Sequence, residues 1–194
     1  NWTASTYNPA TRILYIPIID SCMYYTWLKR TPEEIAAGGS DIRWQNYVPD
    51  NSDGNFGYVQ AFDITTGKTL WKAKHRAVES AALLSTDGGV IFQGSRDRRF
   101  RALDEKTGKT LWEREAPHEK LEEIHSIGSH AQSTSCSDGR IVVSFFGSCG
   151  LFCYDVEGKP LWERRMGPFN NTFGAGSSPI LVDDYVILSQ DHDT

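Results

Sequence analysis

Residues 61–71 read Ala-Phe-Asp-Ile-Thr-Thr-Gly-Lys-Thr-Leu-Trp, and residues 102–112 read Ala-Leu-Asp-Glu-Lys-Thr-Gly-Lys-Thr-Leu-Trp. A third copy, one residue shorter, occupies residues 153–162 and reads Cys-Tyr-Asp-Val-Glu-Gly-Lys-Pro-Leu-Trp. The tryptophans that close the copies lie 41 and then 50 residues apart. A repeat of this length is typical of β-propellers, in which each unit is one blade of four strands.

A second repeated element lies out of phase with the first. It is a turn followed by an apolar run, and it occupies residues 86–92, 137–143 and 182–188, with a looser copy at residues 8–16. Gly or Asp-Gly stands at the turns, where a positive φ is needed. In the best-preserved unit we expect strands near 80–85, 89–94, 99–104 and 109–114. Helical periodicity is weak outside 32–37 and 118–124.

The fold class expected is therefore all-β: an incomplete β-propeller of four-stranded antiparallel blades, spanning residues 1–194 as one partial domain. We expect a blade over 1–75 with a long insertion at 20–54, blades over 76–115 and 116–165, and the start of a further blade over 166–194. Trp71, Trp112 and Trp162 should be buried in equivalent positions between blades. Because the chain starts at Asn1 and stops within a repeat, we expect a fragment whose partners are the remaining blades of a longer chain.

Composition excludes some classes of function. The 194 residues carry 20 Lys and Arg against 25 Asp and Glu, a net charge of −5, whereas a nucleic-acid-binding protein more often presents a basic face. No apolar run is long enough for a transmembrane segment, and no signal peptide is visible. An open arc of blades leaves apolar faces and strand edges uncovered, so we expect the isolated chain to dimerise or aggregate.

The four cysteines do not form a metal or haem motif, because no CxxC pair occurs. Cys149 and Cys153 lie among phenylalanine and leucine residues. They are interpreted as small core residues, with a disulfide between them as the alternative. Cys22 stands alone, and Cys136 is the fourth.

The spacing AxDxxTGxxxW, present twice intact and once degraded, resembles the tryptophan-docking motif of quinoprotein alcohol dehydrogenase propellers. The residues that match this motif are Ala61, Asp63, Gly67, Trp71, Ala102, Asp104, Gly108, Trp112, Asp155, Gly158 and Trp162. Residues 1–17 and 54–63 are similar to later blades of PQQ-dependent methanol and ethanol dehydrogenases. Residues 145–155 and 176–184 are more similar to PQQ-like repeat proteins of bacterial envelopes. The resemblance implies about three and a half blades of an eight-blade ring, in a periplasmic or cell-envelope protein.

The same resemblance implies a PQQ cofactor, with calcium, on the axis of the ring. Asn1 and Trp2 match an Asn-Trp pair that lies beside the cofactor in these dehydrogenases, and the alternative is that they only start an inner strand. Glu79 falls where methanol dehydrogenases have a tryptophan near the cofactor. It is interpreted either as a carboxylate that opposes cofactor binding or as a solvated loop residue. The family's calcium ligands and catalytic Asp match no residue of this chain, so no catalytic or metal-binding residue is assigned. Cys22 matches a cysteine that forms a disulfide in some members, but 23–55 contains no second cysteine.

Three further groups invite a functional reading. His118, His125 and His130 lie close in sequence, with Glu119, Glu122 and Glu123 between the first two, but the histidine spacing matches no standard metal site and a solvated loop is favoured. Asp191, His192 and Asp193 could also hold a divalent ion, but a role without a metal is favoured for them too. Arg96, Arg98, Arg99 and Arg101 are interpreted as a solvated hairpin rather than a phosphate site.

Two functions follow. The first is PQQ-dependent oxidation of a small alcohol or sugar by the complete ring. The alternative is a non-catalytic PQQ-like scaffold that binds proteins in the bacterial envelope, similar to outer-membrane assembly lipoproteins.

Overall fold

The protein, described here by a computed structural model, is built almost entirely from antiparallel sheets. The structure describes residues 3–48, 50–118, 121, 123–125 and 128–190. The first sheet contains β1 (Thr6–Asn8), β2 (Ile13–Ile19), β5 (Gly57–Asp63) and β6 (Lys68–His75). The second contains β7 (Leu84–Ser85), β8 (Val90–Gly94), β9 (Arg99–Asp104) and β10 (Thr110–Glu115). The third contains β11 (Cys136–Ser137), β12 (Ile141–Phe145), β13 (Leu151–Asp155) and β14 (Pro160–Arg164).

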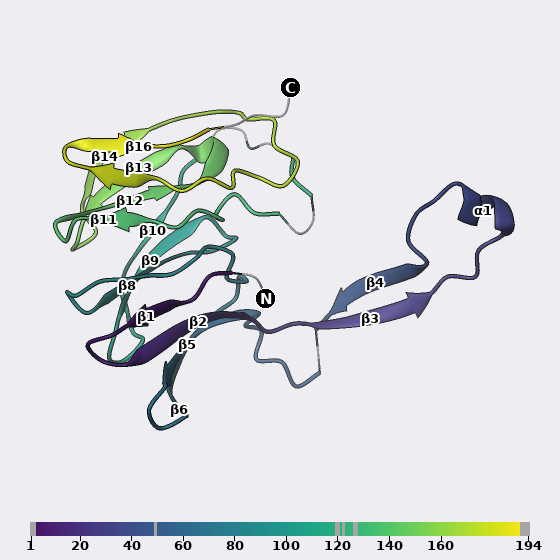
Figure 1. Cartoon of the computed structure of the whole chain (residues 1–194), viewed down its shortest axis with the longest axis horizontal. Helices are drawn as coiled ribbons and strands as arrows, with labels where there is room; N and C mark the ends of the chain where they lie inside the picture. Colours follow the sequence, from purple (N-terminus) through teal and green to yellow (C-terminus); the bar gives the residue numbers. More distant parts are fainter. Residues whose placement is uncertain (1–2, 49, 119–120, 122, 126–127, 191–194) are drawn as a thin grey trace.

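In each four-stranded sheet the order across the sheet follows the order in the chain, which is the arrangement of a propeller blade. A two-stranded sheet of β15 (Ile180–Val182) and β16 (Tyr185–Ile187) follows the third sheet. The sheets are stacked face to face from β6 at one end to β16 at the other (Figure 1). The expected fold class, an incomplete β-propeller, is confirmed.

Stacking explains which side chains are buried, because neighbouring residues of a strand point to opposite faces. Ile91 and Leu103 of the second sheet pack with Tyr15, Val59 and Ala61 of the first. The next residues along the same strands, Phe92 and Ala102, pack instead toward the third sheet. Val142 and Val143 divide in the same way between the second sheet and the β15–β16 pair. A sheet between two others therefore has two buried faces and loses the alternation of polar and apolar residues.

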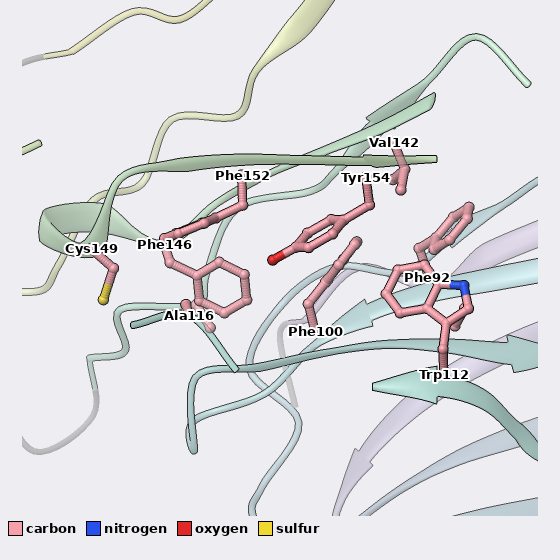
Figure 2. Packing of buried hydrophobic residues seen from close by; sticks show 11 residues of the cluster. Phe92, Phe100, Trp112, Ala116, Val142, Phe146, Cys149, Phe152 and Tyr154 are labelled. Carbon is pink, nitrogen blue, oxygen red and sulfur yellow. The ribbon is translucent and has the colours of Figure 1, made fainter. Parts of the chain in front are cut away.

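Aromatic side chains fill the space between the second and third sheets. Figure 2 shows Phe92, Phe100 and Trp112 facing Phe152 and Tyr154. The rings of Phe100 and Tyr154 are stacked with centroids 6.0 Å apart, and Trp112 meets Phe100 edge-on at 5.6 Å. Such pairs contribute about 0.5–1.5 kcal/mol each beyond the area that they bury.

The insertion at 20–54 forms an arm that projects away from the stacked sheets (Figure 1). Its strands β3 (Cys22–Trp27) and β4 (Ile42–Tyr47) pair as an antiparallel ribbon, and α1 (Pro32–Ala36) forms the tip. Thr31 caps α1: its Oγ1 accepts from the Glu34 N–H, and its own N–H donates to the Glu34 carboxylate at 2.8 Å. The weak helical pattern at 32–37 therefore corresponds to a helix.

The weak helical pattern at 118–124 does not. Residues 118, 121, 123 and 124 have no helical conformation, and the only other helical turn of the described residues is η1 (Gly147–Cys149). Residues 119, 120 and 122 lie outside the described residues, and Leu121 packs against the core between the second and third sheets without a helix around it. Among the described residues, no helix has the length and apolar character needed to cross a membrane.

Candidate functional site

Each copy of the docking motif contains a β-bulge at the leucine before its tryptophan. In the first copy Trp71 lies opposite Ala61 and Thr69 lies opposite Phe62, so Leu70 has no partner. Leu111 and Leu161 are skipped in the same way in the other two copies. All three leucines are about half exposed. The bulge thus turns the leucine to solvent and places the indole beside a small residue, alanine or cysteine, of the neighbouring strand.

The first two tryptophans bind the following sheet in the same way. The indole N–H of Trp71 donates to the Glu105 carbonyl oxygen at 3.0 Å, and that of Trp112 donates to the Val156 carbonyl oxygen at 2.9 Å. Each ring lies on the motif glycine of the next sheet. A Cβ added to Gly108 would come within 2.5 Å of the Trp71 ring, and one added to Gly158 within 2.5 Å of the Trp112 ring. The motif therefore joins one sheet to the next.

The third tryptophan departs from the expected burial. Trp112 is buried and Trp71 is partly buried, but Trp162 is 41% exposed. Its counterpart would be a motif glycine in the sheet of β15 and β16, and that sheet has two strands here. At the other end of the stack, a Cβ added to Gly67 would meet no atom within 4 Å. The expectation of equivalent burial is wrong for Trp162, because no motif glycine of a following sheet lies against its ring among the described residues.

A cavity of about 280 Å³ with both polar and apolar lining, which includes Glu79, lies where the segments leading into the first strands of successive sheets come together. Its lining is rich in hydroxyl and amide groups: Thr3, Ser80, Ser129, Gln132, Thr134 and Ser178. The Ser80 and Ser129 hydroxyls are 2.8 Å apart, and the Ser178 hydroxyl accepts from the Thr134 N–H at 2.9 Å. These bonds connect adjacent sheets on the axial side of the arc.

Arg96 also lines the cavity and gives it a cation. Its guanidinium donates to the Gly128 carbonyl oxygen at 2.6 Å, which fixes the side chain across two sheets. Asn1 and Trp2, the expected cofactor-binding residues, lie outside the described residues. Thr3 and Ala4, which follow them, line the cavity.

Glu79 is fully buried, so its interpretation as a solvated loop residue is wrong. The backbone at residues 77–79 passes so close to Gly57 that a Cβ there would lie 2.6 Å from the Ala77 carbonyl oxygen. This close approach places Glu79 next to the start of β5 in the first sheet. Its backbone forms an isolated antiparallel bridge with Ser95, which follows β8 in the second sheet. One carboxyl oxygen accepts from the Gln93 amide, and the other lies 3.9 Å from Nε2 of His75.

Burial decides the charge of this pair. Desolvation raises the pKa of Glu79 to about 8, and desolvation together with nearby Arg101 lowers the pKa of His75 to about 4. At pH 7 Glu79 is therefore a neutral acid and His75 a neutral imidazole, so their approach is not an ion pair. Oε1 of Glu79, Nε2 of His75 and Oε1 of Gln93 all lack a hydrogen-bond partner within the described part of the chain. In its neutral form Glu79 would add no like charge to an anionic cofactor.

The arginine run is not a solvated hairpin. Arg101 is buried and donates to Glu113 at 2.5 Å and to Asp97 at 2.9 Å. Arg99 also binds Glu113, and Arg98 lies 3.6 Å from Glu115. The hydrogen bond from Ser95 and the neighbouring Arg101 hold the pKa of Asp97 below its usual value despite burial. Sequence reasoning missed this network because two of its acidic members, Glu113 and Glu115, lie across the hairpin on β10.

The remaining candidates are the histidines, glutamates and aspartates singled out in the sequence. Within the described residues, no three His, Cys, Asp or Glu side chains are grouped to hold a metal ion. The His125 ring lies 5.3 Å from the Phe173 ring, and His118 lines a separate cavity with Cys149 and Arg165. Glu119, Glu122, Asp191, His192 and Asp193 lie outside the described residues. All four cysteines are free, and Cys149 and Cys153 are buried core residues.

Comparison with known proteins agrees with this architecture. A family model described as "Outer membrane protein assembly factor BamB", of the PQQ_2 type, matches residues 55–193. The chain belongs to this PQQ-like repeat family.

Relatives of the PQQ-like repeat family that resemble the chain include dehydrogenases. The quinoprotein alcohol dehydrogenase PedE of Pseudomonas putida is 32% identical over 112 residues, which are 58% of this chain and 17% of PedE. Quinohemoprotein alcohol dehydrogenase from Comamonas testosteroni superposes with a TM-score of 0.58 at 22% identity, over 88% of this chain and 27% of that one. BamB from Moraxella catarrhalis superposes with a TM-score of 0.54 at 20% identity, over 71% of this chain and 38% of that one. The chain spans 15–18% of the length of the first curated relatives that it matches.

Proposed function

We propose that the chain is an arc of a quinoprotein-type ring and forms one flank of its axial cofactor site, in a PQQ-dependent enzyme that oxidises an alcohol or sugar. The observation that carries this proposal is the cavity, lined by Arg96 and several hydroxyl groups, on the axial side of four successive sheets. Relatives named quinoprotein alcohol dehydrogenases support the reaction class. Their families also support a periplasmic or envelope location.

The residues of the cavity fit part of such a cofactor. PQQ is a planar anion with three carboxylates, and the cavity offers the Arg96 guanidinium together with hydroxyl donors. Glu79 is neutral below about pH 8 and does not oppose an anion there. The described residues include no metal-ligand set for the accompanying calcium. When bound, PQQ would accept the electrons that the oxidation releases. The role proposed for this chain is to bind and orient PQQ, and no residue of it is assigned to move a substrate proton.

A cavity-filling substitution in the complete ring tests this proposal. Gly176 lines the cavity and a Cβ added there would meet no atom within 4 Å, so Gly176→Phe places a ring at the cavity wall from a position that tolerates a side chain. We expect calorimetric titration with PQQ to show binding at least about tenfold weaker in this variant. Gly88→Phe, at a turn away from the cavity, is the matched control and should bind PQQ normally. Equal affinity in both variants, or no PQQ binding by the ring, would contradict the proposal.

A second function, a protein-binding scaffold, is favoured by a different groove. This groove of about 640 Å³ lies between the turns of the second and third sheets, with an apolar floor that includes Phe92 and Val156 and acidic residues Asp87, Asp138 and Glu157. Such a groove suits a segment with basic and apolar side chains. The scaffold function predicts micromolar binding of a basic amphipathic peptide that is lost in Asp87→Lys and at high salt. An unchanged affinity in that variant would count against it.

A further inference from the structure

The loop between β8 and β9, residues 95–98, carries Arg96 to the axial cavity. A guanidinium on a long side chain binds an anion best when it is already held in place, because a freely rotating arginine loses conformational entropy on binding. The Arg96 N–H donates to the Val78 carbonyl oxygen at 3.3 Å, and its guanidinium donates to the Gly128 carbonyl oxygen at 2.6 Å. Arg96 is therefore held by both its backbone and its side chain, although it lies in a loop.

The two neighbours of Arg96 in the chain are anchored as well. Ser95 is fully buried, and its backbone forms the bridge with Glu79. The Ser95 hydroxyl donates to the Asp97 carboxylate, which also accepts from the Arg99 N–H at 3.2 Å. These contacts fix the backbone on both sides of Arg96, and they thereby fix the direction in which its side chain leaves the loop.

Arg101 on β9 connects both neighbours of Arg96. Its guanidinium donates to the Ser95 hydroxyl oxygen and, at 2.9 Å, to the Asp97 carboxylate. Its Nε donates to the Glu113 carboxylate on β10. Arg101 is buried, so these charge-assisted hydrogen bonds are shielded from competing water. Two of the three partners of Arg101 flank Arg96 in the loop, and the third, Glu113, lies outside the loop.

Arg98 closes the loop in a conformation that arginine rarely adopts. Its φ is +60°, in the left-handed region, and such a residue persists where the surrounding structure determines its conformation. The Arg98 N–H donates to the Ser95 carbonyl oxygen at 2.9 Å, and the Arg98 carbonyl oxygen accepts from the Ala116 N–H at 2.8 Å. Contacts with the rest of the second sheet, rather than local preference, thus define the shape of the loop.

We propose that Arg101 is a positioning residue of the axial cavity: it holds Ser95 and Asp97 so that the Arg96 guanidinium stays at the cavity wall and can bind a carboxylate of PQQ. This role rests on the proposed function, in which Arg96 binds the cofactor. It gives a function to the buried charge of Arg101, whose desolvation is costly unless hydrogen bonds compensate for it. Within the arginine run, Arg96 lines the cavity and Arg101 supports the loop that carries it.

A double-mutant cycle in the complete ring tests the proposal. Asp97→Asn keeps the size of the side chain but removes the charge that binds Arg101. We expect the PQQ affinity, measured by calorimetric titration, to fall by at least about tenfold in Arg96→Gln and by about three- to tenfold in Asp97→Asn. The double variant should bind PQQ only as weakly as Arg96→Gln, because the loop then carries no guanidinium to position. Ser95→Ala, which removes the other contact of Arg101 with the loop, should behave as Asp97→Asn does.

Glu113→Gln is the matched control. It removes the charge of the third partner of Arg101 and leaves both partners in the loop. The variant should therefore unfold more easily but keep the PQQ affinity within about twofold. A merely structural role of Arg101 would instead lower the affinity in Glu113→Gln and in Asp97→Asn alike.

The possible results separate the positioning role from the proposed function. The positioning role alone is overturned by an affinity that Asp97→Asn and Ser95→Ala leave unchanged, or that Asp97→Asn lowers equally with and without the Arg96 guanidinium. An equal loss in Glu113→Gln overturns it as well. No binding of PQQ by the ring, or an affinity that Arg96→Gln leaves unchanged, overturns both the positioning role and the assignment of the cavity to the cofactor.

Discussion

Glu79 and His75 respond to pH in opposite senses because burial disfavours the charged form of each. The raised pKa of Glu79, about 8, means that the folded chain holds a proton that the unfolded chain loses near pH 4.5. Glu79 therefore contributes stability at low pH that is lost as pH rises toward 8. The lowered pKa of His75, about 4, means that stability from His75 is gained between pH 4 and 6.5.

Below pH 6.5 the contributions of Glu79 and His75 to the free energy of unfolding change in opposite directions with pH. Above pH 6.5 mainly the contribution of Glu79 still changes. We expect the free energy of unfolding to be nearly level from pH 4.5 to 6.5 with respect to this pair, and to fall by about 2 kcal/mol between pH 6.5 and 8. Urea denaturation at closely spaced pH values measures this fall.

Glu79→Gln should remove the fall, because the variant has no proton to lose at this position. Glu157→Gln, which changes an exposed carboxyl group, is the control and should keep it. A fall of the same size in Glu79→Gln would show that another group titrates between pH 6.5 and 8.

At the scale of the sheet, the two ends of the stack provide a matched comparison for the docking motif. Gly67 and Gly158 both have positive φ, +69° and +84°, but only Gly158 lies under a tryptophan. Gly67→Ala should destabilise the chain by about 1 kcal/mol through backbone strain. Gly158→Ala should cost at least about 2 kcal/mol more, because its Cβ would overlap the Trp112 ring. Equal losses on chemical denaturation would contradict the docking role.

The tryptophans should differ in the same sense. Trp112→Ala removes a buried ring and its bond to Val156, and we expect a loss of about 3–5 kcal/mol. Trp162→Ala removes a ring without a completed dock, and about 1 kcal/mol is expected. Thermal unfolding of the two variants ranks them directly, and a larger loss in Trp162→Ala would show that its ring is covered in solution.

The spacing of the repeated motif and the Gly or Asp-Gly residues at its turns were sufficient to predict these sheets from the sequence, because each copy encodes the same succession of strand, turn and strand. What could not be predicted depends on contacts between distant residues. Glu79 looked like a loop residue, since nothing in its neighbourhood reveals the tight crossing over Gly57. The arginine run looked solvated, since Glu113 lies across the hairpin. Exposure of Trp162 reflects a missing neighbour rather than any local signal.

For the whole molecule, the arc alone should hold an axial cofactor poorly. The cavity has walls from the stacked sheets described here, one guanidinium from Arg96, and no metal-ligand set among the described residues. An anion with three carboxylates then gains few charged partners and stays largely solvated on its open side. We expect no binding of PQQ at ~micromolar concentration by this chain alone, and no dye-linked dehydrogenase activity, with or without calcium.

Weak PQQ binding can have two causes, the missing walls of the cavity and the charge of ionised Glu79, and the pH dependence of binding separates them. If missing walls are responsible, calorimetric titrations at pH 7 show no heat of binding, and completing the ring restores affinity. Ionised Glu79 adds like charge only above about pH 8, where one neighbouring charge costs on the order of 2–4 kcal/mol at an effective dielectric near 20. The complete ring should therefore bind PQQ more weakly at pH 9 than at pH 7, and Glu79→Gln should reduce that difference. Micromolar binding by the chain alone that weakens in Asn1→Ala would contradict this account, because it would show that the arc already forms a sufficient site.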